Sequence, residues 1–298
     1  MTLTNIHSPL TTDLPVLALA NTGVGLRSPH FEDVLKHKPD VGFLEVHSEN
    51  FLNFGGIPFE YLDEIAKNYV LSFHSVGLSL GSADGLSKTH LGKIKKLLDY
   101  FKPALVSEHL SWSGLHGAVV PDLLPLPLTE QALSVISDNI KHVQDVFGRQ
   151  ILIENPSAYM AFKEESMTEP LFLAKLVEHT GCGLLLDINN IHVSGHNQGF
   201  DTYHYIDEFP GEHVQEIHLA GYHINKVKGE DFLIDAHNNP VYPEVWQLYD
   251  YTLNAFGDRP TLIEWDSDIP MLNTLVTEAK TADTHRRRFR KKAEVSHG

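Results

Sequence analysis

Short apolar runs and longer amphipathic segments alternate along most of the chain. Eight of the apolar runs have the composition of buried strands, and the segments between them carry apolar residues at helical spacing. The runs lie near residues 22–26, 41–47, 70–75, 104–110, 150–155, 183–189, 214–220 and 260–265. This alternation is typical of βα units, in which helices cover a sheet of parallel strands.

The clearest helical segments fall at 87–101, 129–148, 168–181 and 243–257. In the second of them, residues three and four positions apart form one apolar stripe, namely Leu133, Ile136, Ile140, Val143 and Phe147. Thr129 is a candidate N-cap, and Gly148 is a candidate helix end. We therefore predict a helix between these two residues that packs its stripe on the sheet.

Eight strands with intervening helices are the count of a (β/α)8 barrel, so we predict a single TIM barrel of the α/β class. An open doubly wound sheet is the alternative. It needs a glycine-rich phosphate turn after the first strand, and the sequence GVGLRSP at 23–29 matches that turn poorly. We expect the barrel to occupy residues 19–285, with a loosely ordered lead-in at 1–18 and a basic, disordered tail at 286–298.

Composition excludes several classes of partner. The formal net charge of -16 argues against nucleic acid, because phosphate would be repelled over most of the surface. The single cysteine, Cys182, excludes an internal disulfide and a metal site built from thiolates of this chain. The N-terminal segment lacks the features of a signal peptide, and no apolar run is long enough to cross a bilayer. We expect a cytoplasmic protein without a membrane partner.

Most of the eight runs end in His, Glu, Asp or Asn, whereas parallel strands buried on both faces ordinarily stay apolar to their ends. In a barrel, these ends converge on one mouth. The converging candidates are Glu45, His47, His74, Glu108, His109, Glu154, Asn155, Asp187, Asn189, Asn190, His192, His218, His223, Asp235, His237, Glu264 and Asp266. Bound cations are the simplest reason to bury so many acids and imidazoles together. Their number fits two or three ions, and the absence of sulfur ligands suits iron, manganese or zinc.

Each candidate also has a simpler interpretation. A lone histidine at a strand end is more often a hydrogen-bonded core residue than a metal ligand. Glu45 could pair with Arg27, and strand alternation allows only one of Glu108 and His109 to face the mouth. The metal interpretation rests on recurrence across seven strands, which these simpler interpretations would have to explain one by one.

Nine motifs in these segments resemble one known family. They read GVGLRSPHFEDVL, LEVHSENFL, FHSVGLSLGS, SEHLSWSG, LIENPSAYM, LLLDINNIHVSG, IHLAGYH, DAHNNPV and LIEWDSDIP, and they span about residues 20 to 280. The chain is identified by them as a member of the UPF0276 family, also called DUF692. This family contains the iron-dependent peptide-modifying enzymes of methanobactin, bufferin and related biosynthesis, and it is similar to the xylose-isomerase-like barrels.

The resemblance implies a ligand set for three sites. His74 and His109 match the ligands of the first site, and Glu154 matches the carboxylate that bridges to the second. Asp187, His218 and Glu264 match the second site, and Asp235 and His237 match the third. Asn190 stands where the related three-metal endonucleases have His, and His192 is an alternative for that place. A second tier of candidates consists of His47, Glu45, Glu108, Asn155 and His223.

The function implied by the resemblance is oxidation of cysteine in a ribosomally synthesised peptide. It implies two or three iron ions of mixed Fe²⁺ and Fe³⁺ state, dioxygen as co-substrate, and a small partner protein that presents the cysteine-containing precursor peptide. Zinc or manganese could replace iron in purified protein. The catalytic candidates are Glu154, Asp235 and Asp266, the last two for proton transfer. The alternatives are a hydrolase or isomerase on the same barrel, and a metal- or peptide-binding protein without turnover.

Overall fold

Eight parallel strands close into a barrel in the computed structural model, which describes residues 21–115 and 118–296. In chain order, the barrel strands are β1 (Gly23–Gly25), β2 (Leu44–His47), β3 (Leu71–Ser75), β4 (Leu105–His109), β7 (Leu152–Glu154), β8 (Gly183–Asp187), β9 (Val214–Leu219) and β12 (Thr261–Ile263). The first strand pairs with both the second and the last, which closes the ring and rules out the open doubly wound sheet. The predicted TIM barrel is thus confirmed.

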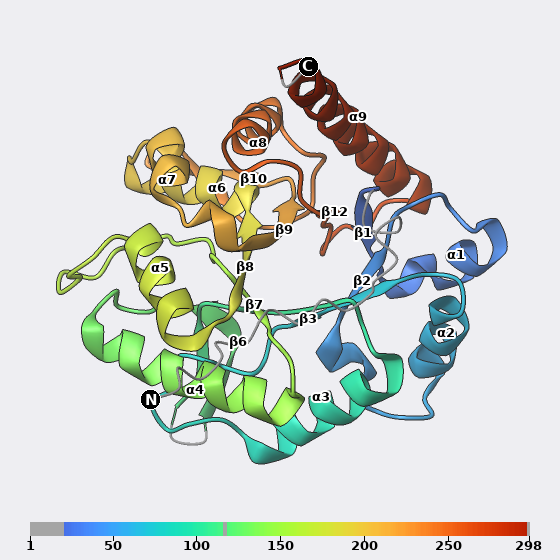
Figure 1. The fold of residues 1–298 in the computed structure, drawn as a ribbon, viewed down its shortest axis with the longest axis horizontal. Helices are drawn as coiled ribbons and strands as arrows, with labels where there is room; N and C mark the ends of the chain where they lie inside the picture. The colour runs from blue at the N-terminus through green and yellow to red at the C-terminus, as the bar shows by residue number, and fades with distance from the viewer. Residues whose placement is uncertain (1–20, 116–117, 297–298) are drawn as a thin grey trace, which may run out of the picture.

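Helices surround the strands, as Figure 1 shows. They are α1 (Phe31–His37), α2 (Ile57–Ala66), α3 (Lys88–Phe101), α4 (Glu130–Phe147), α5 (Glu169–Thr180), α6 (Ile188–Gln198), α7 (Thr202–Glu208), α8 (Pro243–Phe256) and α9 (Leu272–Ser296), with 3-10 turns η1 (Ser28–His30), η2 (Ser48–Phe51) and η3 (Gly211–His213). The four predicted helices are present. In α4 the hydroxyl of Thr129 accepts from the backbone N–H of Ala132, Gly148 ends the helix at a φ of 68°, and the predicted stripe is buried.

Side-chain alternation along each barrel strand separates two environments. Val46, Phe73 and Val106 are buried in the layer between strands and helices. Their neighbours in sequence, such as His47 and His74, line a cavity at the C-terminal ends of the strands. The sequence pattern of apolar residues followed by His or a carboxylate therefore builds the core and the site from the same strands.

Two antiparallel hairpins follow barrel strands and were not predicted. The first consists of β5 (Trp112–Leu115) and β6 (Ala118–Leu124), and the second of β10 (His223–Val227) and β11 (Glu230–Ile234). Every residue of β10 is exposed, so the strand carries no alternation of buried and exposed positions from which it could be recognised.

Two expected boundaries were wrong. The strand expected at 183–189 ends at Asp187, because this residue caps α6 by accepting from the backbone N–H of Asn190 at 2.6 Å. The disordered tail expected from residue 286 is instead the continuation of α9 to Ser296. Arg286 is buried, and its Nε lies 2.6 Å from Oδ1 of Asp258, which anchors this part of the helix. The expected lead-in at 1–18 lies outside the described residues.

No helix in the described part of the chain is long and apolar enough to cross a membrane.

Candidate metal centre

Three buried side chains from neighbouring strands form the first group of candidate ligands. The Nε2 atoms of His74 and His109 are 3.2 Å apart, and Oε2 of Glu154 lies 3.3 Å from the first and 3.4 Å from the second. The strands that carry these residues are adjacent, because β4 pairs with both β3 and β7. Two imidazole nitrogens and a carboxylate oxygen therefore point at one common position, as ligands of a shared cation do.

The second ring nitrogen of each of these histidines contacts a supporting side chain. Nδ1 of His74 lies 2.7 Å from Oγ of Ser107, and Nδ1 of His109 lies 3.4 Å from Oε1 of Glu108. Glu108 is itself fixed, because its Oε2 accepts from the backbone N–H of Leu78 at 3.0 Å. Contacts of this kind set the tautomer and the orientation of a metal-binding imidazole. They leave Nε2 of each ring facing the cavity.

Glu154 also belongs to a second group, together with Asp187 and His218 from the next two strands. The Nδ1 atom of His218 lies 3.1 Å from Oε2 of Glu264, which brings the last strand into the same group. All four side chains are buried. Because Glu154 stands between the two groups, a carboxylate in this position has the geometry to serve two ions.

A third group lies at the rim. Nε2 of His237 is 2.7 Å from Oδ1 of Asp235, and its Nδ1 is 3.2 Å from Oδ2 of Asp266. The backbone of His237 has a φ of 45°, a left-handed conformation that is strained for a residue other than glycine and that persists where the surrounding contacts enforce it. From α6, Asn189 donates from Nδ2 to Oδ1 of Asp235 at 2.7 Å. The next residue, Asn190, lines the same cavity and donates from Nδ2 to Oε1 of Glu154 at 3.2 Å.

Several polar atoms of these groups are buried without a hydrogen-bond partner among the described residues. They include Oε2 of Glu154, Oδ2 of Asp187 and Oδ1 of Asn190. Leaving buried acceptors unsatisfied costs about 1–3 kcal/mol each, and more when they are charged. A cation bound between them would remove this penalty. The donor set of imidazoles and carboxylates therefore fits metal ions.

The charge state of the carboxylates depends on their neighbours. Burial raises the pKa of Glu154 to about 7, and burial together with the nearby Glu154 carboxylate raises the pKa of Asp187 well above its ordinary value. Burial also acts to raise the pKa of Glu264, but the imidazoles of His218 and His237 outweigh it and bring that pKa well below the ordinary range. Glu264 is thus ionised at neutral pH, whereas Glu154 and Asp187 readily hold a proton until a cation replaces it.

Arg27 is part of the site and was not recognised as such from the sequence. Its guanidinium contacts the carboxylate of Asp266 through Nη2 and through Nε at 2.9 Å, and Nη2 lies 3.3 Å from Oε1 of Glu264. The expected pairing with Glu45 does not occur. Glu45 instead accepts from Oγ of Ser72 at 2.8 Å and lies 3.4 Å from Nε2 of His218. Because β1 pairs with β12 as well as with β2, barrel closure brings Asp266 within reach of Arg27.

A cavity of about 240 Å³ opens above these groups and is large enough for one side chain of a substrate. The predicted residues that line it are His47, His74, His109, Glu154, Asn190, Asp235, His237, Glu264 and Asp266. His47 lies at its edge, with Nε2 3.5 Å from Oε1 of Glu264. Of the adjacent pair in β4, His109 lines the cavity and Glu108 supports it, in agreement with strand alternation.

The other predicted candidates lie elsewhere. His192 stacks on the ring of Tyr222 with centroids 5.1 Å apart, on a part of α6 that does not line the cavity. Its proposed place in the third group therefore does not fit, because the helix that begins at Ile188 turns it away. His223 is exposed on β10. Asn155 exchanges two hydrogen bonds with the backbone of Asp187, so it positions this residue rather than facing the cavity.

Glu216 is a further buried acid that sequence reasoning missed. It lies on β9 two residues before His218, and its Oε1 is 3.9 Å from Nε2 of that imidazole. Both of its oxygens lack a hydrogen-bond partner in the described structure. Burial and the charge of Glu45 raise the pKa of Glu216 well above the ordinary value. The signal was present in the E-I-H spacing, because residues two apart on a strand face the same side.

Comparison with known proteins agrees with this architecture. Relatives include the UPF0276 protein of Psychromonas ingrahamii, which is 47% identical over 87% of this chain and 92% of its own length, and the UPF0276 protein of Acaryochloris marina, which is 46% identical over 90% and 95%.

Among solved structures, an L-ribulose 3-epimerase has a TM-score of 0.61 at 14% identity, over 93% of this chain and 98% of the other. A xylose isomerase-like TIM barrel protein from Mycobacterium smegmatis in complex with magnesium has a TM-score of 0.58 at 10% identity, over 90% and 97%. At this level of identity, the two structures show a shared fold. Residues 21–287 match the family model of the RiPP precursor modification enzymes MbnB/TglH/ChrH, where RiPP denotes a ribosomally synthesised and post-translationally modified peptide. The chain belongs to this family.

Proposed function

We propose that the protein is a multinuclear iron-dependent oxygenase that modifies cysteine residues of a RiPP precursor peptide, with dioxygen as co-substrate. The observation that carries the proposal is the position of Glu154, whose carboxylate belongs to two groups of buried candidate ligands at once. Membership in a family of RiPP precursor modification enzymes supports a peptide as the substrate.

The candidate ligands divide among two or three ions. His74, His109 and Glu154 would hold the first. Glu154, Asp187, His218 and Glu264 would hold the second, and Asn190, Asp235 and His237 would hold the third. Ligation by imidazole and carboxylate suits iron in both common oxidation states. When bound, iron supplies one-electron chemistry with dioxygen and stabilises the deprotonated form of a sulfur ligand.

The thiol that reacts comes from the substrate. Cys182 immediately precedes β8, at the opposite end of the barrel from Asp187, and burial raises the pKa of its thiol to about 11. It is thus neither near the cavity nor reactive at neutral pH. The cavity of about 240 Å³ instead accepts a single side chain from outside.

Asp266 is the best placed group to accept a proton from that thiol. Its side chain is 31% exposed at the rim, so it can exchange protons with solvent. Burial and the neighbouring Glu264 act to raise the pKa of Asp266, but Arg27 and His237 outweigh them and lower it, which keeps the carboxylate ionised. Because a lowered pKa also makes it a weaker base, it would accept the proton of a thiol whose own pKa a bound cation has lowered. Arg27 also fixes the orientation of the carboxylate through two nitrogens. Asp235 is the second candidate for this role if it is not a ligand.

Purification under anaerobic and aerobic conditions, followed by elemental analysis and oxygen-uptake measurement, tests the proposal. Two or three iron ions per chain, with oxygen uptake on addition of a cysteine peptide and none with the matched serine peptide, are expected. Zinc alone with phosphatase activity would favour a hydrolase on this barrel. Stable metal without oxygen consumption would favour a protein that only binds metal or peptide.

We also propose that a small partner protein presents the precursor peptide at the mouth of the barrel. The small volume of the metal cavity supports this, because one side chain inserted there provides limited affinity for a whole peptide. Co-expression with the short open reading frames that neighbour the gene, followed by measurement of peptide affinity with and without the co-purified protein, tests this part separately.

A further inference from the structure

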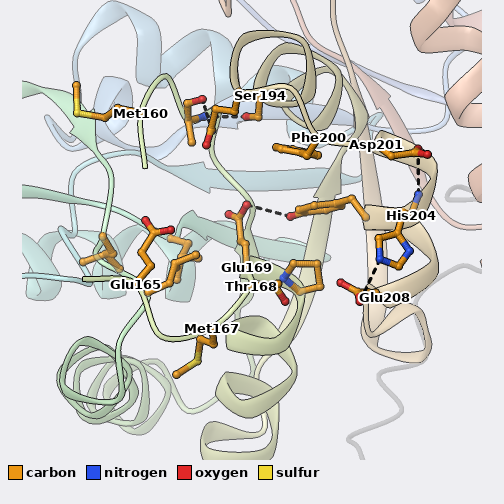
Figure 2. Close-up of a pocket in the computed structure, with 17 residues that line it drawn as sticks. Met160, Glu165, Met167, Thr168, Glu169, Ser194, Phe200, Asp201, His204 and Glu208 are labelled. Atoms are coloured by element: carbon orange, nitrogen blue, oxygen red, sulfur yellow. Dashed lines mark hydrogen bonds and ion pairs between the residues drawn. The ribbon is translucent and has the colours of Figure 1, made fainter. Parts of the chain in front are cut away.

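A second hollow, here called the side pocket, lies between the N-terminal end of α5 and helices α6 and α7 (Figure 2). It has a volume of about 560 Å³. In Figure 2, Met160 and Ser194 lie at one end of the pocket, Met167 lies at the other, and His204 and Glu208 lie on the α7 side. None of the candidate metal ligands lines it.

The side pocket and the metal cavity share one thin wall. In the segment between β7 and α5, Ser157 and Tyr159 line the metal cavity, whereas Ala158 and Met160 line the side pocket. Pro156 also lines the metal cavity, so this irregular segment contributes side chains to both spaces and lies between them. The same relationship holds at the end of β4, where His109 lines the metal cavity and Leu110 lines the side pocket.

Hydrogen bonds fix this wall to the helix behind it. The backbone N–H of Ala158 donates to Oγ of Ser194 at 2.8 Å, and Nε2 of Gln198 donates to the carbonyl of Ala158 at 2.7 Å. On the metal side, the hydroxyl of Tyr159 accepts from the backbone N–H of Asp235 at 2.9 Å. The two spaces are therefore held in a fixed relative position, which a ligand that enters both would require.

The lining of the side pocket combines apolar side chains with acids. Its lining includes leucine, methionine and phenylalanine side chains, and it also includes four acids, Glu165, Glu169, Asp201 and Glu208. The Oε2 atom of Glu169 accepts from the hydroxyl of Tyr205 at 3.1 Å, and burial raises the pKa of Glu169 to about 7. The negative charge of the pocket at neutral pH therefore comes mainly from the other three acids. The residues that line the pocket include His204, which pairs with Glu208 at 3.4 Å, but neither lysine nor arginine. The complementary ligand is an apolar group next to a positive charge.

We propose that the side pocket binds an apolar side chain and an adjoining lysine or arginine of the same precursor peptide whose cysteine enters the metal cavity. This inference rests on the proposed function and names the sequence feature by which the site would select its peptide. The larger volume and apolar lining of the side pocket would supply binding energy that the small polar metal cavity does not. Because residues 156–160 line both spaces, one extended chain could enter the two together.

Calorimetric titration of the full chain with short capped peptides tests the ligand chemistry. Acetyl-Phe-Arg-amide should bind, and acetyl-Phe-Glu-amide and acetyl-Gly-Arg-amide should bind at least about tenfold more weakly, because each lacks one of the two complementary features. The measurement is made on both metal-free and metal-loaded protein, and the affinity of acetyl-Phe-Arg-amide should be the same in both. Equal affinity for the Arg and Glu peptides would overturn the proposal.

A matched pair of exposed methionines locates the binding site. Met160 is 64% exposed and lines the side pocket, and Met271 is 79% exposed and does not. Met160→Lys should weaken binding of acetyl-Phe-Arg-amide by about tenfold, because it places a like charge at the pocket. Met271→Lys should leave binding unchanged. Since both side chains are largely in solvent, neither change threatens the fold, and unaltered binding in Met160→Lys would contradict the assignment.

Linked peptides test whether the two spaces serve one ligand. In the series acetyl-Cys-(Gly)n-Phe-Arg-amide, with n from one to six, at least one member should bind metal-loaded protein about 10- to 100-fold more tightly than acetyl-Phe-Arg-amide. This gain in affinity should vanish when Ser replaces Cys in the peptide or when metal is removed from the protein. If no linker length gives a gain, the side pocket is not part of the substrate path. If the gain is present but no oxygen is consumed, the proposed oxygenase activity fails while the peptide path stands.

Discussion

Asn190 donates a hydrogen bond from Nδ2 to Oε1 of Glu154, and the two atoms are 3.2 Å apart. Glu154 belongs to two groups of candidate ligands, and Oδ1 of Asn190 is buried without a hydrogen-bond partner among the described residues. The contact therefore links the amide proposed for the third ion to the carboxylate proposed to bridge the other two. Because the link is direct, a substitution at Glu154 should alter metal binding in all three groups of candidate ligands.

We expect Glu154→Ala to lose more than one metal ion per chain, because one carboxylate serves two groups of ligands. Oxygen uptake with a cysteine peptide should fall by more than about 100-fold, which exceeds the effect of removing a residue that only supports a ligand. Elemental analysis after anaerobic loading with iron measures the first effect. His142→Ala, an exposed change on α4, should retain its metal. Full metal content and activity in Glu154→Ala would rule out the bridge.

The stability of metal-free protein should fall as the pH rises from 5 to 9. The folded chain holds protons on Glu154 and His109 more tightly than the unfolded chain, since their pKa values are raised from 4.5 to about 7 and from 6.5 to about 9. The first contribution is complete below pH 4.5 and is lost as the pH rises through about 7. The second is complete below pH 6.5 and is lost as the pH rises through about 9.

Thermal unfolding of chelator-treated protein at several pH values measures this trend. Glu154→Gln cannot ionise at this position, so its melting temperature should decline less than that of the unaltered chain between pH 5 and pH 7. An equal decline in both proteins would show that Glu154 is not the titrating group.

Metal affinity should rise with pH, whereas the stability of metal-free protein should fall. A cation binds the ionised carboxylate, and burial raises the pKa of Glu154 to about 7, so binding must displace a proton below that pH. We expect the apparent affinity to fall by about tenfold for each pH unit below 7 per proton released. Competition titrations with a chelator of known affinity at pH 6.0 and pH 7.5 provide the comparison. Because the pKa of His109 is raised to about 9, this ligand must also release a proton at both pH values. Affinities that agree at pH 6.0 and pH 7.5 would argue against both Glu154 and His109 as ligands.

Arg27→Met should destabilise metal-free protein more than metal-loaded protein. The guanidinium contacts Glu264 and Asp266, and its removal leaves Glu264 buried without this cation. Breaking a buried pair in this way typically costs about 3–5 kcal/mol, and bound metal would offset part of the loss. Urea unfolding in both states measures the difference. Arg288→Met, on the exposed side of α9, is the control. If Arg27→Met lowers the free energy of unfolding equally in metal-free and metal-loaded protein, the role of Arg27 does not depend on the metal.

Helix α9 should matter for stability beyond residue 285. Arg286 is almost fully buried, with its Nε 2.6 Å from Oδ1 of Asp258. Arg286→Ala removes a buried side chain and one of two arginine partners of Asp258, since Nε of Arg290 also lies 2.7 Å from Oδ2 of Asp258. It should reduce the free energy of unfolding by about 2 kcal/mol, largely through lost packing. Arg288→Ala on the exposed side of the helix should change it by less than about 0.5 kcal/mol. If both variants match the unaltered chain in urea unfolding, the buried contact contributes nothing to the fold.

The barrel was predictable because its strands repeat one pattern, an apolar run followed by a polar end. The strand at β9 shows this clearly, since Ile217 and Leu219 pack in the core whereas Glu216 and His218 are buried among the polar side chains of the site. The positions of His192 and of the residues after 286 were not predictable in the same way. The direction in which His192 points depended on whether Asp187 would end a strand or cap a helix. Both are common roles for Asp at a strand end.

Sequence alone determined the type of fold and most members of the polar cluster, because strand periodicity is local and because parallel strands in a barrel all end at one mouth. It did not determine which polar atoms face each other. Arg27 and Asp266 are 239 positions apart, and closure of the ring between β1 and β12 brings them into contact. Nothing near Arg27 in the sequence distinguishes Asp266 from Glu45 as its partner. Only the three-dimensional arrangement selects it, since electrostatic pairing depends on distance through space and not along the chain.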